Sequence, residues 1–369
     1  MPCPGPLTVA LVSTEAQWHG GEEQARLLAD GLRQRGHRVA ILARRGGAFA
    51  GRMAAEGHAL LPFGGSGRSP AAIWRVRRAL RQLRPDVLHA NDGHALTAAG
   101  LASLGLGIPA RVASRRVVFP IRHALRYRAF CGRLICVSRR VAEVCLQSGI
   151  PPRLVCVVHD GVDPQRIASG DRGRGRRTLG ASDADRVLLT VAKLTDAKGH
   201  RFLLDAMPAV LAQRPEARLF LAGDGELADP LRKQAEKLGI QSAVHFLGYR
   251  NDVHDLIHAA DLFVFPSHME GMGSTLIDAM LAGAPIVTTT AGGIPDVTGA
   301  SEPGSEPTAW TVPACDSGAL AAAILQALQS PDQCATLAQR ARRRAEQLFT
   351  AERMVEATLE VYREVLRPT

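Results

Sequence analysis

The chain has 369 residues, of which 46% are hydrophobic, so it exceeds one ordinary domain and holds enough apolar residues for two cores. Only 4% of the residues are aromatic, which argues against nucleic-acid binding through stacked bases, and we expect no nucleic-acid partner. The formal net charge of +10 favours an anionic partner such as phosphate or acidic lipid.

The cysteines and the apolar segments bear on the cellular compartment. The seven cysteines form no C-x-x-C pair, which argues against a disulfide framework or a structural zinc site and favours a reducing cytosol. No basic segment precedes the first apolar run, and the uncharged stretch 95–110 is glycine-rich and too short to span a bilayer. We therefore expect a cytoplasmic protein without a signal peptide or a transmembrane helix.

Short apolar runs alternate with amphipathic segments through the first half of the chain. In the first amphipathic segment, Ala25, Leu28, Ala29 and Leu32 recur at helical spacing, and Gly36 follows. Helices are predicted over 22–35 and 70–83, and strands over 7–12, 39–42, 87–89, 111–118, 133–137 and 155–158.

The alternation breaks after Asp163 and resumes at residue 187. Residues 164–185 are polar and charged and include Gly170, Gly173 and Gly175, which predicts a linker or exposed loop. Two further helices are predicted within 332–366. Strands are predicted over 187–191, 218–222, 244–247, 262–265 and 285–288, and helices over 200–212, 229–238, 252–259 and 274–283.

Continuous apolar strands separated by helices predict parallel sheets covered on both faces. The expected fold class is therefore α/β, with two Rossmann-like doubly wound domains that face each other across a cleft. The expected boundaries are 1–165 for the first domain, 166–185 for the linker and 186–345 for the second domain. A C-terminal helix within 346–369 is expected to cross back to the first domain.

A turn rich in glycine and hydroxyl residues joins the predicted strand 262–265 to the predicted helix 274–283. A helix that starts this way presents unpaired backbone N–H groups and the positive end of its dipole, which suit phosphate. Glu270 and Asp278 flank the turn, and carboxylates are good acceptors for sugar and ribose hydroxyls. The pattern predicts a site for a nucleotide that carries a sugar.

Three further loops of the second half follow predicted strands and are expected to line the same cleft. Lys193 and Lys198 follow strand 187–191, where two cations can neutralise a departing diphosphate; surface lysines are the ordinary alternative. Gly223 and Gly225 form a tight turn, which is as consistent with simple turn chemistry as with ligand contact. Leu247 follows a strand end that can present backbone groups to a base.

The first half holds two candidate clusters. Gly20 and Gly21 open the first helix, where glycine lets the backbone approach a ligand, although the G-x-G-x-x-G dinucleotide fingerprint is absent. His89 and His94, with Asn91 and Asp92 between them, follow strand 87–89. An arginine pair at 115 and 116 follows residues 111–113 of the predicted strand 111–118 and is a candidate for binding the acceptor or the leaving phosphate.

An arginine-rich segment from Arg111 to Arg140 contains no Asp or Glu. It is consistent with a solvated basic face or with a docking surface for an anionic membrane or acceptor. Its nine arginines are at positions 111, 115, 116, 122, 126, 128, 133, 139 and 140.

Taken together, these motifs resemble glycosyltransferase family 4, whose members are retaining enzymes of the GT-B fold. The resemblance covers nearly the whole chain. The segments 159–163 and 285–296 also resemble the family. The segment Gly20-Gly21-Glu22-Glu23 is similar to the family's Gly-Gly-x-Glu motif, and Lys193 and Lys198 are similar to its diphosphate-binding pair. Gly223 and Gly225 resemble the family's Gly-x-Gly turn. Glu270 and Asp278 resemble its Glu-x7-Glu signature.

Three positions depart from the family pattern. Asp278 is one methylene shorter than the usual glutamate. Lys193 stands where the family usually has an arginine, so a bidentate hydrogen bond to phosphate is lost. Ser114 and the arginine pair after it stand where the family often has a histidine, which we interpret as a subgroup trait.

The resemblance implies a transfer of sugar, with retention, from a nucleotide-diphosphate sugar bound by the second domain to a hydroxyl acceptor bound by the first. The expected acceptor is a cell-envelope glycan or a lipid-linked acceptor in polysaccharide or lipopolysaccharide biosynthesis, met at the inner face of the plasma membrane. No cofactor and no catalytic metal are expected. The expected catalytic residues are Lys193, Lys198, Glu270, His94 and Arg116, and the expected donor-binding residues are Gly20, Gly21, Glu23, Gly223, Leu247, Gly271, Met272, Gly273, Ser274, Thr275, Leu276 and Asp278.

Three alternatives remain open at this point. A nucleotide-sugar epimerase of the same fold would turn over donor without acceptor. A catalytically inactive homologue would follow if the changes at Asp278 and Lys193 abolish activity. A protein that binds anionic surfaces would lose binding steeply with salt and ignore nucleotide sugars.

Overall fold

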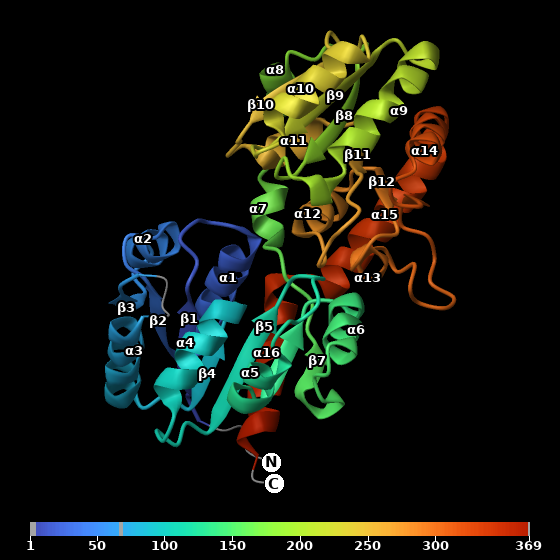
Figure 1. Ribbon diagram of the computed structural model, residues 1–369. Coiled ribbons are helices and arrows are strands. Elements are labelled where there is room, and N and C mark those ends of the chain that lie inside the picture. Colours follow the sequence, from blue (N-terminus) through green and yellow to red (C-terminus); the bar gives the residue numbers. More distant parts are fainter. Residues whose placement is uncertain (1–4, 66–68, 368–369) are drawn as a thin grey trace. The chain divides into compact units, whose positions relative to one another are not determined.

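The computed structural model describes residues 5–65 and 69–367. The chain divides into two compact units, of which the first contains the residues up to Gly161 and those from Ala351 onward, and the second contains Val162–Thr350. Each unit is built on its own parallel sheet, which confirms two Rossmann-like domains (Figure 1).

The first unit contains a seven-stranded sheet in the order β3-β2-β1-β4-β5-β6-β7. The central strand β1 is almost fully buried, as expected for an apolar strand covered on both faces. The strands are β1 (Thr8–Ser13), β2 (Arg38–Arg44), β3 (Ala59–Phe63), β4 (Val87–Ala90), β5 (Ala110–Arg115), β6 (Arg133–Cys136) and β7 (Val155–Val157). The helices are α1 (Gly20–Gln34), α2 (Ala48–Ala55), α3 (Pro70–Leu83), α4 (Gly93–Ser103), α5 (Ala124–Phe130), α6 (Arg139–Gln147), the 3-10 helix η1 (Pro152–Leu154) and α16 (Ala351–Leu366).

The last helix, α16, belongs to the first unit, although it follows the second unit in sequence. It packs beside α1, where Gly31 permits a close approach: a Cβ on Gly31 would lie 2.5 Å from a methyl carbon of Val355 (Figure 1). Val355, Leu359 and Tyr362 join the core of the first unit. The chain changes units at Ala351 rather than at residue 346.

The second unit contains a six-stranded sheet in the order β10-β9-β8-β11-β12-β13. Its strands are β8 (Arg186–Val191), β9 (Ala217–Ala222), β10 (Val244–Gly248), β11 (Leu262–Phe265), β12 (Ile286–Thr289) and β13 (Trp310–Val312). Its helices are α7 (Pro164–Ala168), α8 (Arg172–Leu179), the 3-10 helix η2 (Asp196–Lys198), α9 (His200–Gln213), α10 (Ala228–Lys237), α11 (Val253–Ala259), α12 (Ser274–Ala282), α13 (Ile294–Thr298), α14 (Ser317–Gln329) and α15 (Pro331–Leu348).

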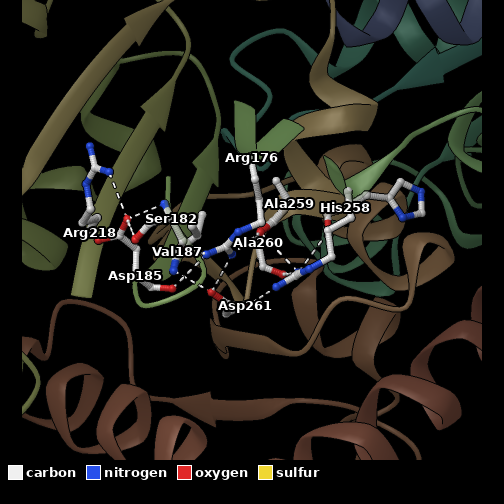
Figure 2. Close-up of polar contacts among 10 residues, drawn as sticks. Arg176, Ser182, Asp185, Val187, Arg218, His258, Ala259, Ala260 and Asp261 are labelled. Carbon is white, nitrogen blue, oxygen red and sulfur yellow. Dashed lines mark hydrogen bonds and ion pairs between the residues drawn. The ribbon is translucent and has the colours of Figure 1, made fainter. Parts of the chain in front are cut away.

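The predicted linker at 166–185 is wrong, because most of this segment forms α7 and α8 and packs within the second unit. Its arginines bind carboxylates and carbonyls where the sheet's strands begin. Arg176 is 7% exposed, donates to Asp261 at 3.2 Å and also reaches the Ser182 carbonyl (Figure 2). Asp261 in turn accepts from the Val187 amide at 2.8 Å. The polar composition therefore reflects an ion-pair network rather than a solvated linker.

Several short elements gave no sequence signal. Strand β3 contains Pro62 and lies at the edge of the sheet. Proline is tolerated there because one side of an edge strand forms no hydrogen bonds with a neighbouring strand. Helix α4 is rich in alanine, and its buried residues surround most of its circumference, so it lacks amphipathic spacing. No helix in the described part of the chain has the length and apolarity that crossing a membrane requires.

Candidate active site

The second sheet reverses its strand order between β8 and β11. Strands β9 and β10 extend from β8 toward one edge, and β12 and β13 extend from β11 toward the other. In doubly wound sheets, ligands bind at the carboxyl ends of the two strands that flank such a reversal. The loops that follow β8 and β11, residues 192–199 and 266–273, therefore mark the expected ligand position.

These two loops bring Lys198 and Glu270 together. Lys198 Nζ donates to Glu270 Oε2 at 2.5 Å, and the side chains are 24% and 10% exposed. The ammonium also lies 5.7 Å from the centroid of the Phe265 ring. Lys193, in the same loop, is exposed. An ammonium and a carboxylate that are distant in sequence thus meet at the strand reversal.

Two glycines without a predicted role allow the loops to approach this closely. A Cβ on Gly199, where φ is +67°, would lie 2.1 Å from the Pro266 carbonyl oxygen. A Cβ on Gly292 would lie 2.0 Å from the Glu270 carbonyl oxygen, and the Gly293 amide donates to that oxygen at 3.0 Å. The backbone of Glu270 is therefore held from a third loop, the one that follows β12.

Gly223 and Gly225 pack directly against the loop after β8. A Cβ on Gly223 would lie 1.9 Å from the Ala192 carbonyl oxygen, and one on Gly225 would lie 2.4 Å from that of Leu194. Close packing thus accounts for both glycines, and a direct contact with ligand stays a prediction. Leu247 is half-buried in β10, and its expected backbone contact with a base stays a prediction.

The loop after β11 enters α12 through Gly273, which has a φ of +94° and no side chain to cap the helix. The first N–H groups of α12 therefore suit an anion. Ser274 and Thr275 are half-buried, whereas the side chains of Met272 and Leu276 are 2% and 0% exposed. Met272 and Leu276 can meet a ligand only through their backbone groups.

The two signature carboxylates lie on either side of this helix start. Glu270 is followed by the buried Gly271, and Asp278 is half-buried on the fifth position of α12. Their expected contacts with sugar and ribose hydroxyls stay predictions.

His200 and Ser267 are buried polar residues in this region that the sequence reading missed. His200 begins α9 and is 2% exposed, and burial, aided by Lys198, lowers its pKa to about 4, so its ring is neutral at pH 7. Ser267 directly follows Pro266 and is fully buried. Among the described residues, neither side chain has a hydrogen-bond partner. A single histidine after a glycine carries no periodic signal that would have revealed it.

The first sheet reverses its order between β1 and β4. Gly20 and Gly21 begin α1 after β1, and Asn91 follows β4. Asn91 Nδ2 donates to the Gly21 carbonyl oxygen at 3.1 Å. The glycine pair and the polar residues after β4 therefore meet at the second strand reversal, as doubly wound folds require of a ligand site.

Arg116 is already engaged within the first unit. Its Nε donates to Asp160 Oδ1 at 3.0 Å, and its Nη1 donates to Asn91 Oδ1 at 2.9 Å. Burial raises the pKa of Asp160, and the Arg116 guanidinium opposes that rise. These contacts make Arg116 a residue that positions Asn91, and its expected contact with acceptor or leaving phosphate stays a prediction.

Glu22, rather than the expected Glu23, is the buried carboxylate at the start of α1. Glu22 is 2% exposed, and burial together with repulsion from Glu15 and Asp92 raises its pKa to about 7. Glu23 instead pairs with Arg26 at 2.7 Å, one helical turn away. The expected role of Glu23 in donor binding stays a prediction.

The two histidines of the first half have different environments. His94 is exposed in the first turn of α4. His89 is 1% exposed, its ring nitrogens lie 2.6 Å from the Tyr362 hydroxyl and 2.7 Å from the Ser114 hydroxyl, and burial lowers its pKa to about 3. The predicted pairing of these histidines in one site is wrong, because His89 is a neutral core residue.

One group of side chains within residues 5–65 and 69–367 has the spacing of metal ligands: Asp30, Glu56 and His58. Arg26 Nη1 lies 2.8 Å from Asp30 and 4.0 Å from Glu56, so both carboxylates already face a cation. The expectation that catalysis needs no metal stays a prediction.

Two family profiles match the chain, described as "Glycosyltransferase Family 4" over residues 18–166 and "Glycosyl transferases group 1" over residues 171–344. An uncharacterised glycosyltransferase from Methanocaldococcus jannaschii is 33% identical over 184 residues, which is 47% of each chain. The lipopolysaccharide core biosynthesis mannosyltransferase LpsB of Rhizobium meliloti is 27% identical over 263 residues, which is 68% of this chain and 73% of LpsB.

Among solved structures, HepE from Anabaena in complex with UDP and glucose matches with a TM-score of 0.85 at 23% identity, over 96% of this chain and 99% of HepE. This likeness shows the fold. The alignment with the Methanocaldococcus jannaschii protein spans about half of that relative's length.

Proposed function

Since the chain belongs to glycosyltransferase family 4, we propose that it moves a sugar, with retention, from a nucleotide-diphosphate sugar to a hydroxyl acceptor. The contact of 2.5 Å between Lys198 and Glu270 carries this proposal. It places a cation and a hydroxyl-binding carboxylate together at the strand reversal of the second sheet, beside the uncapped start of α12. Diphosphate and sugar need these two kinds of group next to each other.

In the proposed donor site, each part of the nucleotide-diphosphate sugar contacts a different group of the second unit. The first N–H groups of α12 bind the distal phosphate, and Lys193 and Lys198 neutralise the diphosphate as it leaves. Glu270 accepts hydrogen bonds from the sugar, and Asp278 accepts them from the ribose. Because Lys198 donates to Glu270 at 2.5 Å, the proposed site requires this lysine to serve both the carboxylate and the diphosphate.

The proposed reaction proceeds on one face of the sugar. The bond from the anomeric carbon to the diphosphate oxygen breaks as the acceptor oxygen bonds to the same face. The departing diphosphate takes the acceptor proton, so anomeric configuration is retained without an enzymatic nucleophile. Lys193 and Lys198 stabilise the negative charge that develops on the diphosphate.

We propose a cell-envelope glycan or lipid-linked molecule as acceptor, met by a cytoplasmic enzyme at the membrane surface. LpsB, which is similar over 68% of this chain, is named for lipopolysaccharide core biosynthesis. In the first unit, Arg122, Arg128, Phe119 and Leu125 are exposed, and the last two are 55% and 75% exposed. Exposed apolar and cationic side chains together favour an anionic bilayer surface.

Thermal stabilisation by nucleoside diphosphates and their sugars, without added metal, tests the donor site. A ligand that binds only the folded state raises the melting temperature, so a shift with one base identifies the nucleotide. NMR of the product's anomeric proton then tests retention. Absence of any shift in a folded sample would favour the inactive homologue or the anionic-surface binder, and donor turnover without acceptor would favour the epimerase.

A further inference from the structure

A buried side chain of α1 holds the chain at the point where it leaves the first unit. Gln24 is 2% exposed. Its Nε2 donates to the Gly161 carbonyl oxygen at 2.8 Å, and its Oε1 accepts from the Gly161 amide at 2.9 Å. Gly161 is the last residue before the chain enters the second unit. One side chain thus satisfies both backbone groups of the residue at the crossing.

The next residue, Val162, is held by the second unit. Its amide donates to the Phe349 carbonyl oxygen at 2.9 Å, and it pairs with Thr350 in a parallel bridge. Phe349 and Thr350 directly precede the point at which the chain returns to the first unit. Since Gly161 and Val162 are fixed to different units, any rotation between the units must be absorbed by a few backbone dihedral angles at the two crossings.

Helix α1 also anchors the returning chain. Helix α16 is the first element after the return, and it packs beside α1. The closest approach involves Gly31 of α1, where a Cβ would lie 2.5 Å from a methyl carbon of Val355. Both connections between the units are therefore attached to one helix of the first unit.

The start of this same helix belongs to the expected ligand-binding edge of the first sheet. Gly20 and Gly21 begin α1 at the strand reversal between β1 and β4. The Gly21 carbonyl oxygen accepts from Asn91 Nδ2 at 3.1 Å, and Asn91 Oδ1 accepts from Arg116 Nη1 at 2.9 Å. The glycine turn is thereby tied to the loops that follow β4 and β5.

Arg116 connects this edge of the sheet to the crossing. Its Nε donates at 3.0 Å to Oδ1 of Asp160, the residue before Gly161. The hydrogen bonds therefore form a closed ring, which leaves α1 at Gly21 and returns to α1 at Gln24. Within the first unit, the ligand-binding edge and the crossing are parts of one hydrogen-bonded assembly.

We propose that Gln24 is a positioning residue for sugar transfer, because it fixes the crossing at Gly161 to the helix that begins at the Gly20–Gly21 turn. The inference rests on the proposed function, in which the donor is bound by the second unit and the acceptor by the first. Groups on two units reach reacting distance reproducibly only if their connection allows few arrangements. Gln24 limits these arrangements by keeping Gly161 on the first unit, so that movement occurs beyond it.

Replacing Gln24 by methionine tests this role, since methionine has a similar length and makes neither hydrogen bond. Amide hydrogen exchange of a peptide that contains residues 159–163 should become at least about tenfold faster. Stabilisation by nucleoside diphosphate should be retained, because the donor groups lie in the second unit. The kcat of sugar transfer should fall at least about tenfold, as expected when reacting groups are misplaced.

Two control variants separate positioning from a general loss of stability. Gln34→Met changes an exposed glutamine on the same helix and should leave exchange and kcat unchanged. Met53→Ala removes a fully buried side chain from α2 and should lower the melting temperature without lowering kcat at a temperature where the protein is folded. An equal fall in kcat for Met53→Ala and Gln24→Met would overturn the proposal, because stability alone would then explain it.

Gln24→Glu adds a rescue that depends on the hydrogen bonds themselves. An ionised carboxylate only accepts, whereas the neutral acid both donates and accepts, as the amide does. Burial favours the neutral form, so the kcat of Gln24→Glu relative to the wild type at the same pH should rise as the pH falls. The wild type carries the same neighbouring titratable groups, Glu22 among them, so the ratio removes their contribution. A ratio as low as that of Gln24→Met at every pH would overturn the proposal.

The exchange and activity measurements distinguish this proposal from the proposed function. Unchanged exchange of residues 159–163 in a folded Gln24→Met protein would show that Gln24 does not hold the crossing, whatever the turnover. Loss of the stabilisation by nucleoside diphosphate in this variant would also overturn the proposal, because the change would then act on the donor site. Absence of sugar transfer by the wild type would instead overturn the proposed function, and with it this role in transfer.

Discussion

Replacing Lys198 by methionine tests the ion pair at the strand reversal of the second sheet. Methionine keeps most of the side-chain volume and removes an ammonium 2.5 Å from Glu270. At an effective dielectric constant of about 20, attraction at this distance amounts to about 6–7 kcal/mol before desolvation and ordering costs. Because the side chains are 24% and 10% exposed, we expect a net loss of about 1–3 kcal/mol in unfolding free energy, between surface and buried pairs.

Sugar transfer should fall more steeply than stability does. If Lys198 faces the departing diphosphate, its loss should lower kcat about 10²–10³-fold, as removal of one oxyanion donor does. Urea unfolding measures the first quantity, and release of nucleoside diphosphate in the presence of acceptor measures the second. Lys237→Met, at an exposed position of α10, is the control for a lost lysine charge.

Two results would refute this reasoning. Turnover by Lys198→Met close to that of the wild type would remove the lysine from the mechanism. An unchanged urea midpoint would show that the pair contributes no net stability. A double-mutant cycle with Glu270→Gln then measures the coupling energy directly, provided that neither single change creates a new contact.

Three other substitutions test the surroundings of the site and the fold. Gly223→Ala should lower the unfolding free energy by more than about 1 kcal/mol and weaken nucleotide binding, because its Cβ would lie 1.9 Å from a carbonyl oxygen. Gly239→Ala is the control, because Gly239 also has a positive φ but open space around its Cβ position. Urea unfolding of this control measures how much of the loss comes from backbone strain alone. Glu22 has a folded pKa of about 7 against 4.5, so its stabilising contribution is complete below pH 4.5 and is lost as the pH rises through 7. Glu22→Gln should therefore flatten the stability profile between pH 5 and 8 by about 2–3 kcal/mol in urea titrations, and an unchanged slope would contradict the raised pKa. Arg176→Met should cost about 1–3 kcal/mol, because the Ser182 and Asp185 carbonyls lose a buried donor while Asp261 keeps its pair with Arg172 at 2.6 Å. The exposed Arg177→Met should stay within about 0.5 kcal/mol, and equal melting temperatures for these two variants would contradict the network's role.

Local patterns in the sequence identified the main strands and their parallel arrangement. Strands such as β1 and β8 are continuous apolar runs of a kind that a sheet covered on both faces requires. Motif spacing also placed Lys198 and Glu270 after two different strands. It did not require them to touch, because the distance between two loops depends on which strands are neighbours.

Tertiary contacts decided the state of each charged side chain. Glu22 and Glu23 are identical in type and adjacent in sequence, yet helix geometry buries one and leaves the other beside Arg26. Arg116 and Arg115 are likewise neighbours, and among the described residues only Arg116 meets a carboxylate, Asp160, which lies 44 residues away in the sequence. The polar segment 166–185 packs within the second unit, where Arg174 pairs with Asp255 and Arg176 with Asp261, and composition alone does not reveal these partners.

The sequence by itself determined the strand and helix alternation, the glycine-rich turns and the resemblance to family 4, because these depend on neighbouring residues. Only the tertiary structure decided that Lys198 pairs with Glu270, that His89 is a neutral core residue, and that Arg176 joins the network around Asp261. Burial and charge pairing are properties of the packed chain, since strand order brings distant loops together and fixes which groups lose contact with water.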